Sequence, residues 1–147
     1  MRHRQAIALL ALAGWFVACY LWLYKIGVIG PLQCGTGACE TVQTSRYAEF
    51  LGIPVAFYGV VGYAALVLAS LAGLRPGLAG SRGMTRLLAG LATGGLLFTV
   101  YLTYLELFVI HAICRWCVAS AVIMTALWGV ALHAWVVEYD RPSAWTV

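Results

Sequence analysis

The chain has 147 residues, of which 63% are hydrophobic and 10% charged, and its formal net charge is +4. A soluble domain averages about 25% charged residues, so this chain has too few to cover a water-facing surface. The composition therefore excludes an ordinary soluble domain and predicts an all-α integral membrane protein, with one domain over residues 1–147. The nine Lys and Arg residues are scattered, which argues against nucleic-acid binding and fits contact with membrane lipid.

The first predicted span covers about residues 6–24, and a membrane helix needs about 20 mostly apolar residues. The stretch MRHRQAIALLALAGWFVAC also resembles a lipoprotein signal peptide in which Cys19 would be the lipid acceptor. The apolar run continues past Cys19 through YLWLY, which favours a retained span over a cleaved one. In a retained span, we expect Cys19 to be a buried small hydrophobic residue.

A loop over residues 25–52 follows, and it contains the segment Cys34-Gly-Thr-Gly-Ala-Cys39. Two glycines, Gly35 and Gly37, separate the cysteines and predict a flexible segment. Thiol–disulfide exchange requires one sulfur to attack another. A flexible pair therefore suits a relay that meets a soluble partner and then reaches Cys114.

Three more spans are predicted, over about residues 53–74, 86–108 and 113–136, which makes a bundle of four transmembrane helices. Pro54 suits the first turn of the second span. The turn GLRPGLAGSRGMTR joins the second span to the third. Gly90 and Gly94 in the third span are a candidate patch for close helix packing; the alternative is ordinary glycine in a membrane helix.

The placement of Lys and Arg predicts that both termini are cytoplasmic. With that orientation, six basic residues lie inside, namely Arg2, Arg4, Arg75, Arg82, Arg86 and Arg141. Three lie outside, namely Lys25, Arg46 and Arg115. The loop 25–52 and the junction 109–113 are then on the outer side of the membrane.

This topology places Cys34, Cys39, Cys114 and Cys117 at the outer face, where disulfides persist in a bacterium. Cys114 and Cys117 lie in the first turn of the fourth span, where unpaired N–H groups and the helix dipole stabilise a thiolate. A disulfide between positions i and i+3 of a helix requires local adjustment of the backbone. Such a bond is expected to be labile and redox-active rather than structural.

A cysteine pair at the membrane edge must pass its electrons onward. The sequence shows no haem, flavin or iron–sulfur motif, so a lipid-soluble quinone is the natural acceptor. Three other interpretations stay open for the cysteines: a zinc site in which His111 can replace one ligand, structural disulfides, or inert helix residues. The oxidising face and the clustering of four cysteines favour the redox interpretation.

Three segments carry a resemblance to a known family. They are Cys39 followed by ETVQTSRY, the stretch LGIPVAFYG, and VYLTYLELFVIHAICRWC. On these segments, roughly residues 7–137 resemble the vitamin K epoxide reductase family and specifically its bacterial homologues. A DsbB-type protein is the nearest alternative, but that family usually carries its CxxC in the first outer loop, whereas here it comes last.

The resemblance implies a quinone-dependent thiol–disulfide oxidoreductase in the bacterial inner membrane. Such an enzyme reoxidises a periplasmic thioredoxin-like, DsbA-type partner acting in trans, and so supports disulfide-bond formation. Electrons would pass from the partner to Cys34 and Cys39, then to Cys114 and Cys117, and then to a quinone of the menaquinone or ubiquinone type. Cys39 is the expected contact of Cys114, and Cys117 faces the quinone.

The resemblance also assigns roles to residues around the cysteines. Ser45 corresponds to the family's loop serine, which helps to cap the active site, and the segment 42–51 is expected to form a short helix over the pocket mouth. The quinone pocket is expected to include Cys117, Ser45, Phe57 and Ala121. Ala121 stands where animal members carry a tyrosine, and Pro54-Val55-Ala56 where they carry an asparagine, which argues against epoxide reduction.

Two polar residues near the CxxC have alternative roles. His111 either favours the Cys114 thiolate from one turn away or is an interfacial loop histidine. Glu106 either touches the quinone region or reaches water, as an acid near the end of a span more often does.

Overall fold

The computed structural model describes residues 2–32, 34 and 38–140. Four helices in this part are long and apolar enough to cross a membrane, in agreement with the predicted all-α bundle and a multi-pass protein. They are α1 (Arg2–Lys25), α3 (Val55–Ala72), α4 (Arg82–Tyr104) with its continuation η2 (Leu105–Ile110), and α5 (Arg115–Asp140). Gly35, Gly37 and Arg141, on which the predicted loop flexibility and orientation partly rest, lie outside the described residues.

Shorter elements connect α1 to α3: α2 (Ala38–Thr44), the 3-10 turn η1 (Arg46–Ala48), and the strands β1 (Glu49–Phe50) and β2 (Ile53–Pro54). The strands pair antiparallel, with Glu49 opposite Pro54. The expected helix over 42–51 is therefore wrong in extent, because the helix begins at Ala38 and ends at Thr44. The hairpin turn places Leu51 and Gly52 at φ 55° and 78°, a left-handed conformation that an α-helix excludes.

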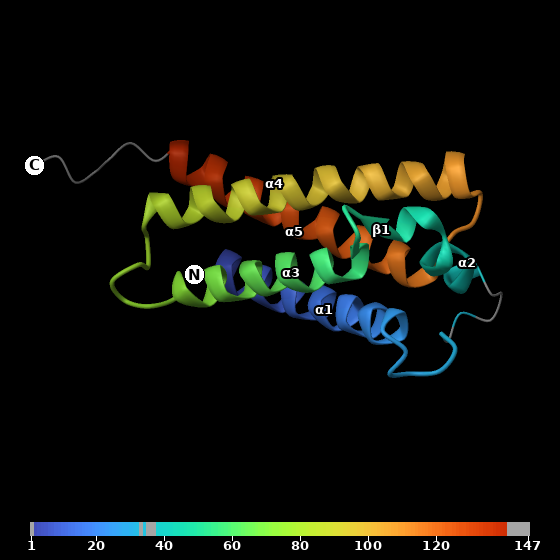
Figure 1. Ribbon diagram of the computed structural model, residues 1–147. Coiled ribbons are helices and arrows are strands. Elements are labelled where there is room, and N and C mark those ends of the chain that lie inside the picture. The colour runs from blue at the N-terminus through green and yellow to red at the C-terminus, as the bar shows by residue number, and fades with distance from the viewer. Residues whose placement is uncertain (1, 33, 35–37, 141–147) are drawn as a thin grey trace, which may run out of the picture.

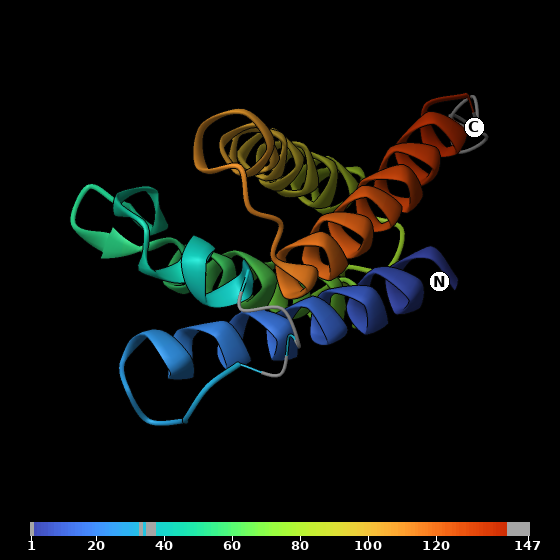
Figure 2. The same cartoon turned by 90° about the vertical axis from the view of Figure 1, so that its right-hand side faces the viewer.

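The spanning helices form one bundle in which α1 packs against α3 and α5, while α4 packs against α5 and α3 (Figure 1). The start of α1 and the end of α5 lie at the same end of the bundle (Figure 1). The opposite end carries α2 and β1, beside the start of α5 (Figure 2). We call this second end the capped end.

The core of the bundle uses small residues where helices approach closely. A Cβ at Gly14 on α1 would overlap the ring of Tyr63 on α3, so only glycine permits this approach. The Tyr63 hydroxyl is 3.0 Å from the carbonyl oxygen of Ser120 and 2.9 Å from its Oγ, which ties α3 to α5. These contacts fix the three helices around an apolar centre that includes Ile7, Ala11, Ala18, Leu66, Leu88, Ala92 and Leu127.

Close packing on α4 occurs at a different glycine from the predicted pair. Nothing lies within 4 Å of a Cβ built at Gly90 or Gly94, so this pair makes no close helix contact within the described chain. Gly95 instead faces Met124 of α5, whose side chain fills the space that a Cβ would take.

At the end of the bundle away from the cap, the Arg4 guanidinium is buried against the connection between α3 and α4. It donates hydrogen bonds to the carbonyl oxygens of Gly73, Leu78 (2.9 Å) and Ser81 (3.2 Å), and to Thr85 Oγ1 (3.3 Å). Cleavage before Cys19 would remove Arg4 and most of the buried face of α1. The residues before Cys19 are thus part of the packed bundle in the described structure.

Candidate functional site

Three cysteines meet in one apolar cluster at the capped end. Cys34, Cys39 and Cys114 have exposed fractions of 2%, 0% and 0% and pack with Leu21, Leu32, Val42 and Ala56. Cys34 and Cys39 form a disulfide with a Cα–Cα distance of 6.1 Å, whereas Cys19, Cys114 and Cys117 carry none. Sulfurs joined in a disulfide are not thiolate ligands, so this arrangement disfavours a four-cysteine zinc site.

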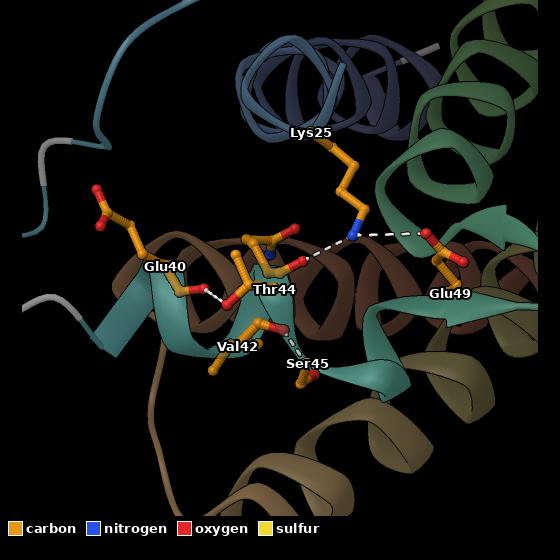
Figure 3. A network of polar contacts seen from close by, with 7 residues as sticks. Lys25, Glu40, Val42, Thr44, Ser45 and Glu49 are labelled. Carbon is orange, nitrogen blue, oxygen red and sulfur yellow. Dashed lines mark hydrogen bonds and ion pairs between the residues drawn. The ribbon is translucent and has the colours of Figure 1, made fainter. Parts of the chain in front are cut away.

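The helix α2 carries Cys39 in its first turn and is anchored to the end of α1 (Figure 3). Lys25 Nζ donates to the Gln43 carbonyl oxygen at 3.0 Å and lies 3.6 Å from Glu49 Oε1 (Figure 3). The Ser45 hydroxyl donates to the Val42 carbonyl oxygen at 2.8 Å (Figure 3). Ser45 therefore closes the last turn of α2, and the described structure gives it no hydrogen bond to a cysteine.

The two cysteines of the CxxC have different surroundings. Cys114 immediately precedes α5, and its carbonyl oxygen accepts the Val118 N–H at 2.9 Å. The hydrogen bond from the Cys117 thiol, aided by the N–H groups of Cys117 and Trp116, lowers the pKa of Cys114 although burial and Glu106 oppose this. Cys114 is thus the more acidic thiol of the pair, as expected for a sulfur that leaves readily in thiol–disulfide exchange.

Two polar side chains converge on the CxxC from other elements. Gln43 of α2 is buried and its Nε2 lies 3.6 Å from Cys117 Sγ. Glu106 of η2 is 7% exposed, its Oε2 accepts the Cys114 N–H at 3.3 Å, and its side chain also hydrogen-bonds with Cys117. Of the two roles considered for Glu106, the structure agrees with the buried one and not with a carboxyl group that reaches water.

Gln43 is a residue that sequence reasoning missed. The signal was its spacing, because Gln43 lies four residues after Cys39 and therefore on the same face of α2. For Glu106, the signal was an acidic residue within an otherwise apolar span.

The backbone between α4 and α5 explains how Glu106 comes to lie under Cys114. The residues of η2 form a π-helical turn that ends at His111, whose φ is 56°. The His111 and Ala112 N–H groups both donate to the Glu106 carbonyl oxygen. The side chain of His111 is exposed, and the described structure gives it no hydrogen bond to Cys114. His111 thus acts here through its backbone, by reversing the chain direction before Cys114.

A cavity of about 950 Å³ lies between α4, η2 and α5, and Cys117 is in its wall. Its walls are almost entirely apolar, and the polar groups that reach it include Thr99, Thr103 and Glu106. Of the four residues expected at the quinone pocket, Cys117 and Ala121 line this cavity and Ser45 and Phe57 do not. Phe57 instead packs on Trp22 of α1, with ring centroids 5.6 Å apart.

The size and chemistry of this cavity fit a flat apolar ring that carries polar oxygens, because drug-sized ligands occupy sites of about 300–1,000 Å³ with few polar groups. A thiol at one wall of such a cavity can give electrons to a ring bound there. The Cys34–Cys39 disulfide packs in one cluster with Cys114, and Cys117 packs against this cluster.

The model of the vitamin K epoxide reductase family matches residues 5–132, which is most of the chain.

Proposed function

The chain belongs to the vitamin K epoxide reductase family, whose members are quinone-linked thiol–disulfide oxidoreductases that act with thioredoxin-like partners, and from this membership we propose a specific reaction for it. The chain acts as a single membrane domain that reoxidises a DsbA-type thioredoxin-like protein in trans. It reduces a quinone of the menaquinone or ubiquinone type, and it thereby supports disulfide-bond formation outside the cytoplasm.

The electron path that we propose uses the cysteines in two pairs. The dithiol of the partner reduces the Cys34–Cys39 disulfide and is itself oxidised to a disulfide, and the Cys39 thiolate then attacks Cys114 of an oxidised CxxC. Cys34 resolves the mixed disulfide by attacking Cys39, which leaves Cys114 and Cys117 reduced. The described state, with a disulfide on the loop pair and thiols on the CxxC, corresponds to the end of this transfer.

The observation that carries this proposal is the position of the CxxC. Cys114 lies in the buried cluster with the loop disulfide, whereas Cys117 lies in the wall of the apolar cavity. One helical turn thus connects a disulfide-exchange site to a site for a lipid-soluble acceptor. When bound, the quinone supplies the two-electron oxidation of the CxxC dithiol; the residues that would hold it are the cavity walls of α4 and α5, including Ala121.

For the membrane, we propose the inner membrane of a bacterium with both termini in the cytoplasm. The capped end and the four cysteines of the relay then face the periplasm, where the partner is found. The placement of Lys and Arg along the chain supports this orientation.

The test is quinone reduction by the purified protein in lipid nanodiscs, driven by a reduced thioredoxin-like protein. We expect Cys34→Ala, Cys39→Ala, Cys114→Ala and Cys117→Ala each to abolish turnover. Cys19→Ala is the matched control and should keep the wild-type rate, because Cys19 lies on α1 and carries no disulfide. Full turnover in both Cys34→Ala and Cys114→Ala would overturn the relay.

The order of the relay is tested by trapping its intermediate. In Cys117→Ala, the Cys114 thiolate can attack Cys39 of the loop disulfide and release the Cys34 thiolate, and no Cys117 is present to resolve the product, so a disulfide between Cys39 and Cys114 should accumulate. Mass spectrometry of non-reduced peptides identifies that bond. If Cys114 were found bonded only to Cys34, the proposed order within the loop pair would be wrong.

A further inference from the structure

A carboxyl group is buried in the redox site without a cation beside it. Glu106 is 7% exposed, and in the described part of the chain the ion pair that forms is the one between Lys25 and Glu49. A carboxylate at membrane depth costs several kcal/mol unless it is paired or neutralised. Residues that bear such a cost usually face a functional site.

The contacts of Glu106 join it to the two cysteines of the CxxC. Its Oε2 accepts the Cys114 N–H at 3.3 Å, which fixes the carboxyl group beneath the CxxC. Its side chain also interacts with the Cys117 side chain, whose single thiol proton can be directed either to the Glu106 carboxylate or to the Cys114 sulfur. The titratable groups in contact with it are therefore the two cysteines, and Gln43, which approaches Cys117 from α2, is neutral.

Glu106 also lines the apolar cavity together with Cys117. The carboxyl group thus has access to the thiol proton and to the space in which an acceptor would bind. The other polar side chains in that wall are poor proton acceptors at neutral pH, namely Thr99, Thr103, Tyr104 and Thr125.

We propose that Glu106 is a catalytic residue, the base that takes the proton of the Cys117 thiol when the CxxC is oxidised and then delivers it to the reduced quinone. This inference rests on the proposed function and adds a proton path to it.

The step balances in atoms and charge. The Cys114 thiolate and the Cys117 thiol form one S–S bond and give up two electrons, which reduce the quinone, and the Cys117 proton moves to the Glu106 carboxylate. Quinol formation takes up two protons. One comes from Glu106, which regenerates the carboxylate, and the other comes from water and replaces the proton that Cys114 had lost on ionisation.

Glu106→Gln separates the proton transfer from the structural role. The glutamine has nearly the same volume, and its amide oxygen can still accept the Cys114 N–H, but it cannot accept a proton. A positioned general base contributes about 10²–10⁴-fold to a rate, so we expect quinone reduction to fall by about 10²-fold or more. Exchange between the loop pair and the CxxC, measured in a single turnover without quinone, should not slow, because the substitution removes the negative charge that disfavours the Cys114 thiolate.

Two matched variants accompany this one. Glu138→Gln makes the same change on α5 near its other end and should leave both half-reactions unchanged. Glu106→Ala opens space at the wall of the cavity, so added formate should restore quinone reduction in a concentration-dependent way. A residue that only held the backbone in place would not be rescued by a free carboxylate.

A readout independent of turnover is the infrared difference spectrum between the dithiol and disulfide forms of the CxxC. Oxidation by a chemical oxidant in the absence of quinone should leave the released proton on Glu106, which produces a carboxylic acid C=O band. That band should be missing in Glu106→Gln and present in Glu138→Gln.

Three results would overturn the inference: wild-type quinone reduction in Glu106→Gln, equal loss of both half-reactions in that variant, or a Glu106→Ala enzyme that formate does not restore. If the wild-type protein itself reduced no quinone, the proposed function would fail instead. In that case the infrared band alone decides the inference, and its absence from the wild-type spectrum would refute Glu106 as the base.

Discussion

At the scale of single residues, the two cysteines of the CxxC differ because of what surrounds each one. Cys114 receives hydrogen bonds that stabilise its thiolate, whereas Cys117 donates a hydrogen bond to it and lies in the cavity wall. The spacing of the motif predicted the pair, since a first helical turn favours a thiolate. It did not predict the contact with Gln43, because that depends on where α2 lies over the bundle.

We expect Cys117→Ala to raise the pKa of Cys114, because the substitution removes the strongest of the hydrogen bonds that lower it. A raised pKa reduces the thiolate fraction at a fixed pH, so alkylation of fully reduced protein at neutral pH should slow several-fold. The pH at which alkylation reaches half its maximum should move upward. The measurement is the rate of iodoacetamide reaction against pH in a Cys19→Ala, Cys34→Ala, Cys39→Ala background. An unchanged profile would show that Cys117 does not stabilise the thiolate.

Substitutions at His111 can separate the role of its backbone conformation from the role of its imidazole side chain. Its φ of 56° is uncommon for a residue with a side chain and easy for glycine, and the left-handed conformation costs a non-glycine residue roughly 1–2 kcal/mol. His111→Gly should therefore keep quinone reduction and raise the melting temperature slightly. His111→Val, with a β-branched side chain, should lower it. Loss of turnover in the stable glycine variant would instead identify the imidazole as the group that matters.

At the scale of elements, the number and approximate positions of the spans were predicted well, because a long apolar stretch is enough to identify a membrane helix. The ends of the spans and the elements between α1 and α3 were not predicted well. The third span was placed at about residues 86–108, but the helix begins at Arg82 and continues through η2 to Ile110. No pattern in the sequence distinguishes a π-helical turn from an α-helical one. Between α2 and α3, a hairpin turn at Leu51 stands where a helix was expected. The sequence did not predict this turn, because Leu is uncommon in hairpin turns.

Besides its buried apolar contacts, the cap (α2, η1, β1 and β2) is held to the bundle by Lys25. Its hydrogen bond to the Gln43 carbonyl oxygen is charge-assisted, and such bonds contribute about 1.5–3 kcal/mol. Its ion pair with Glu49 is half exposed and contributes less than about 1 kcal/mol. Lys25→Met should therefore speed amide hydrogen exchange throughout α2, and Glu49→Gln should not. Equal acceleration in the two variants would show that the ion pair carries the anchoring.

At the scale of the whole molecule, the cavity opens on the side of the bundle rather than along its axis. Its lining includes Val100, Phe108 and Val122, whose exposed fractions are 59%, 65% and 63% and which lie on the face that lipid would touch. The composition predicted a membrane protein and an acceptor from the bilayer. Which helices line the cavity was not predictable, because it depends on how α4 and α5 pack against each other.

The orientation across the membrane is tested by cysteine labelling in a background without native cysteines. Gly30 and Gly77 lie at opposite ends of the bundle, both are exposed, and a Cβ at either has open space. Gly30→Cys should react with a membrane-impermeant maleimide in intact spheroplasts, and Gly77→Cys only after the membrane is disrupted. The reverse pattern would place the redox site in the cytoplasm.

The hydrogen bonds of Arg4 impose an order on the biogenesis of the molecule. Its acceptors lie 69 to 81 residues further along the chain, so the first helix leaves the ribosome long before its guanidinium can be satisfied. Until the α3–α4 connection has been synthesised and inserted, α1 resides in the bilayer as an incomplete unit with an exposed cation at one end. When translation is stalled before residue 73 has emerged, α1 of the nascent chain should therefore be sensitive to proteases. Its resistance to proteolysis should appear abruptly once residue 85 has emerged, because all acceptors of Arg4 are then available.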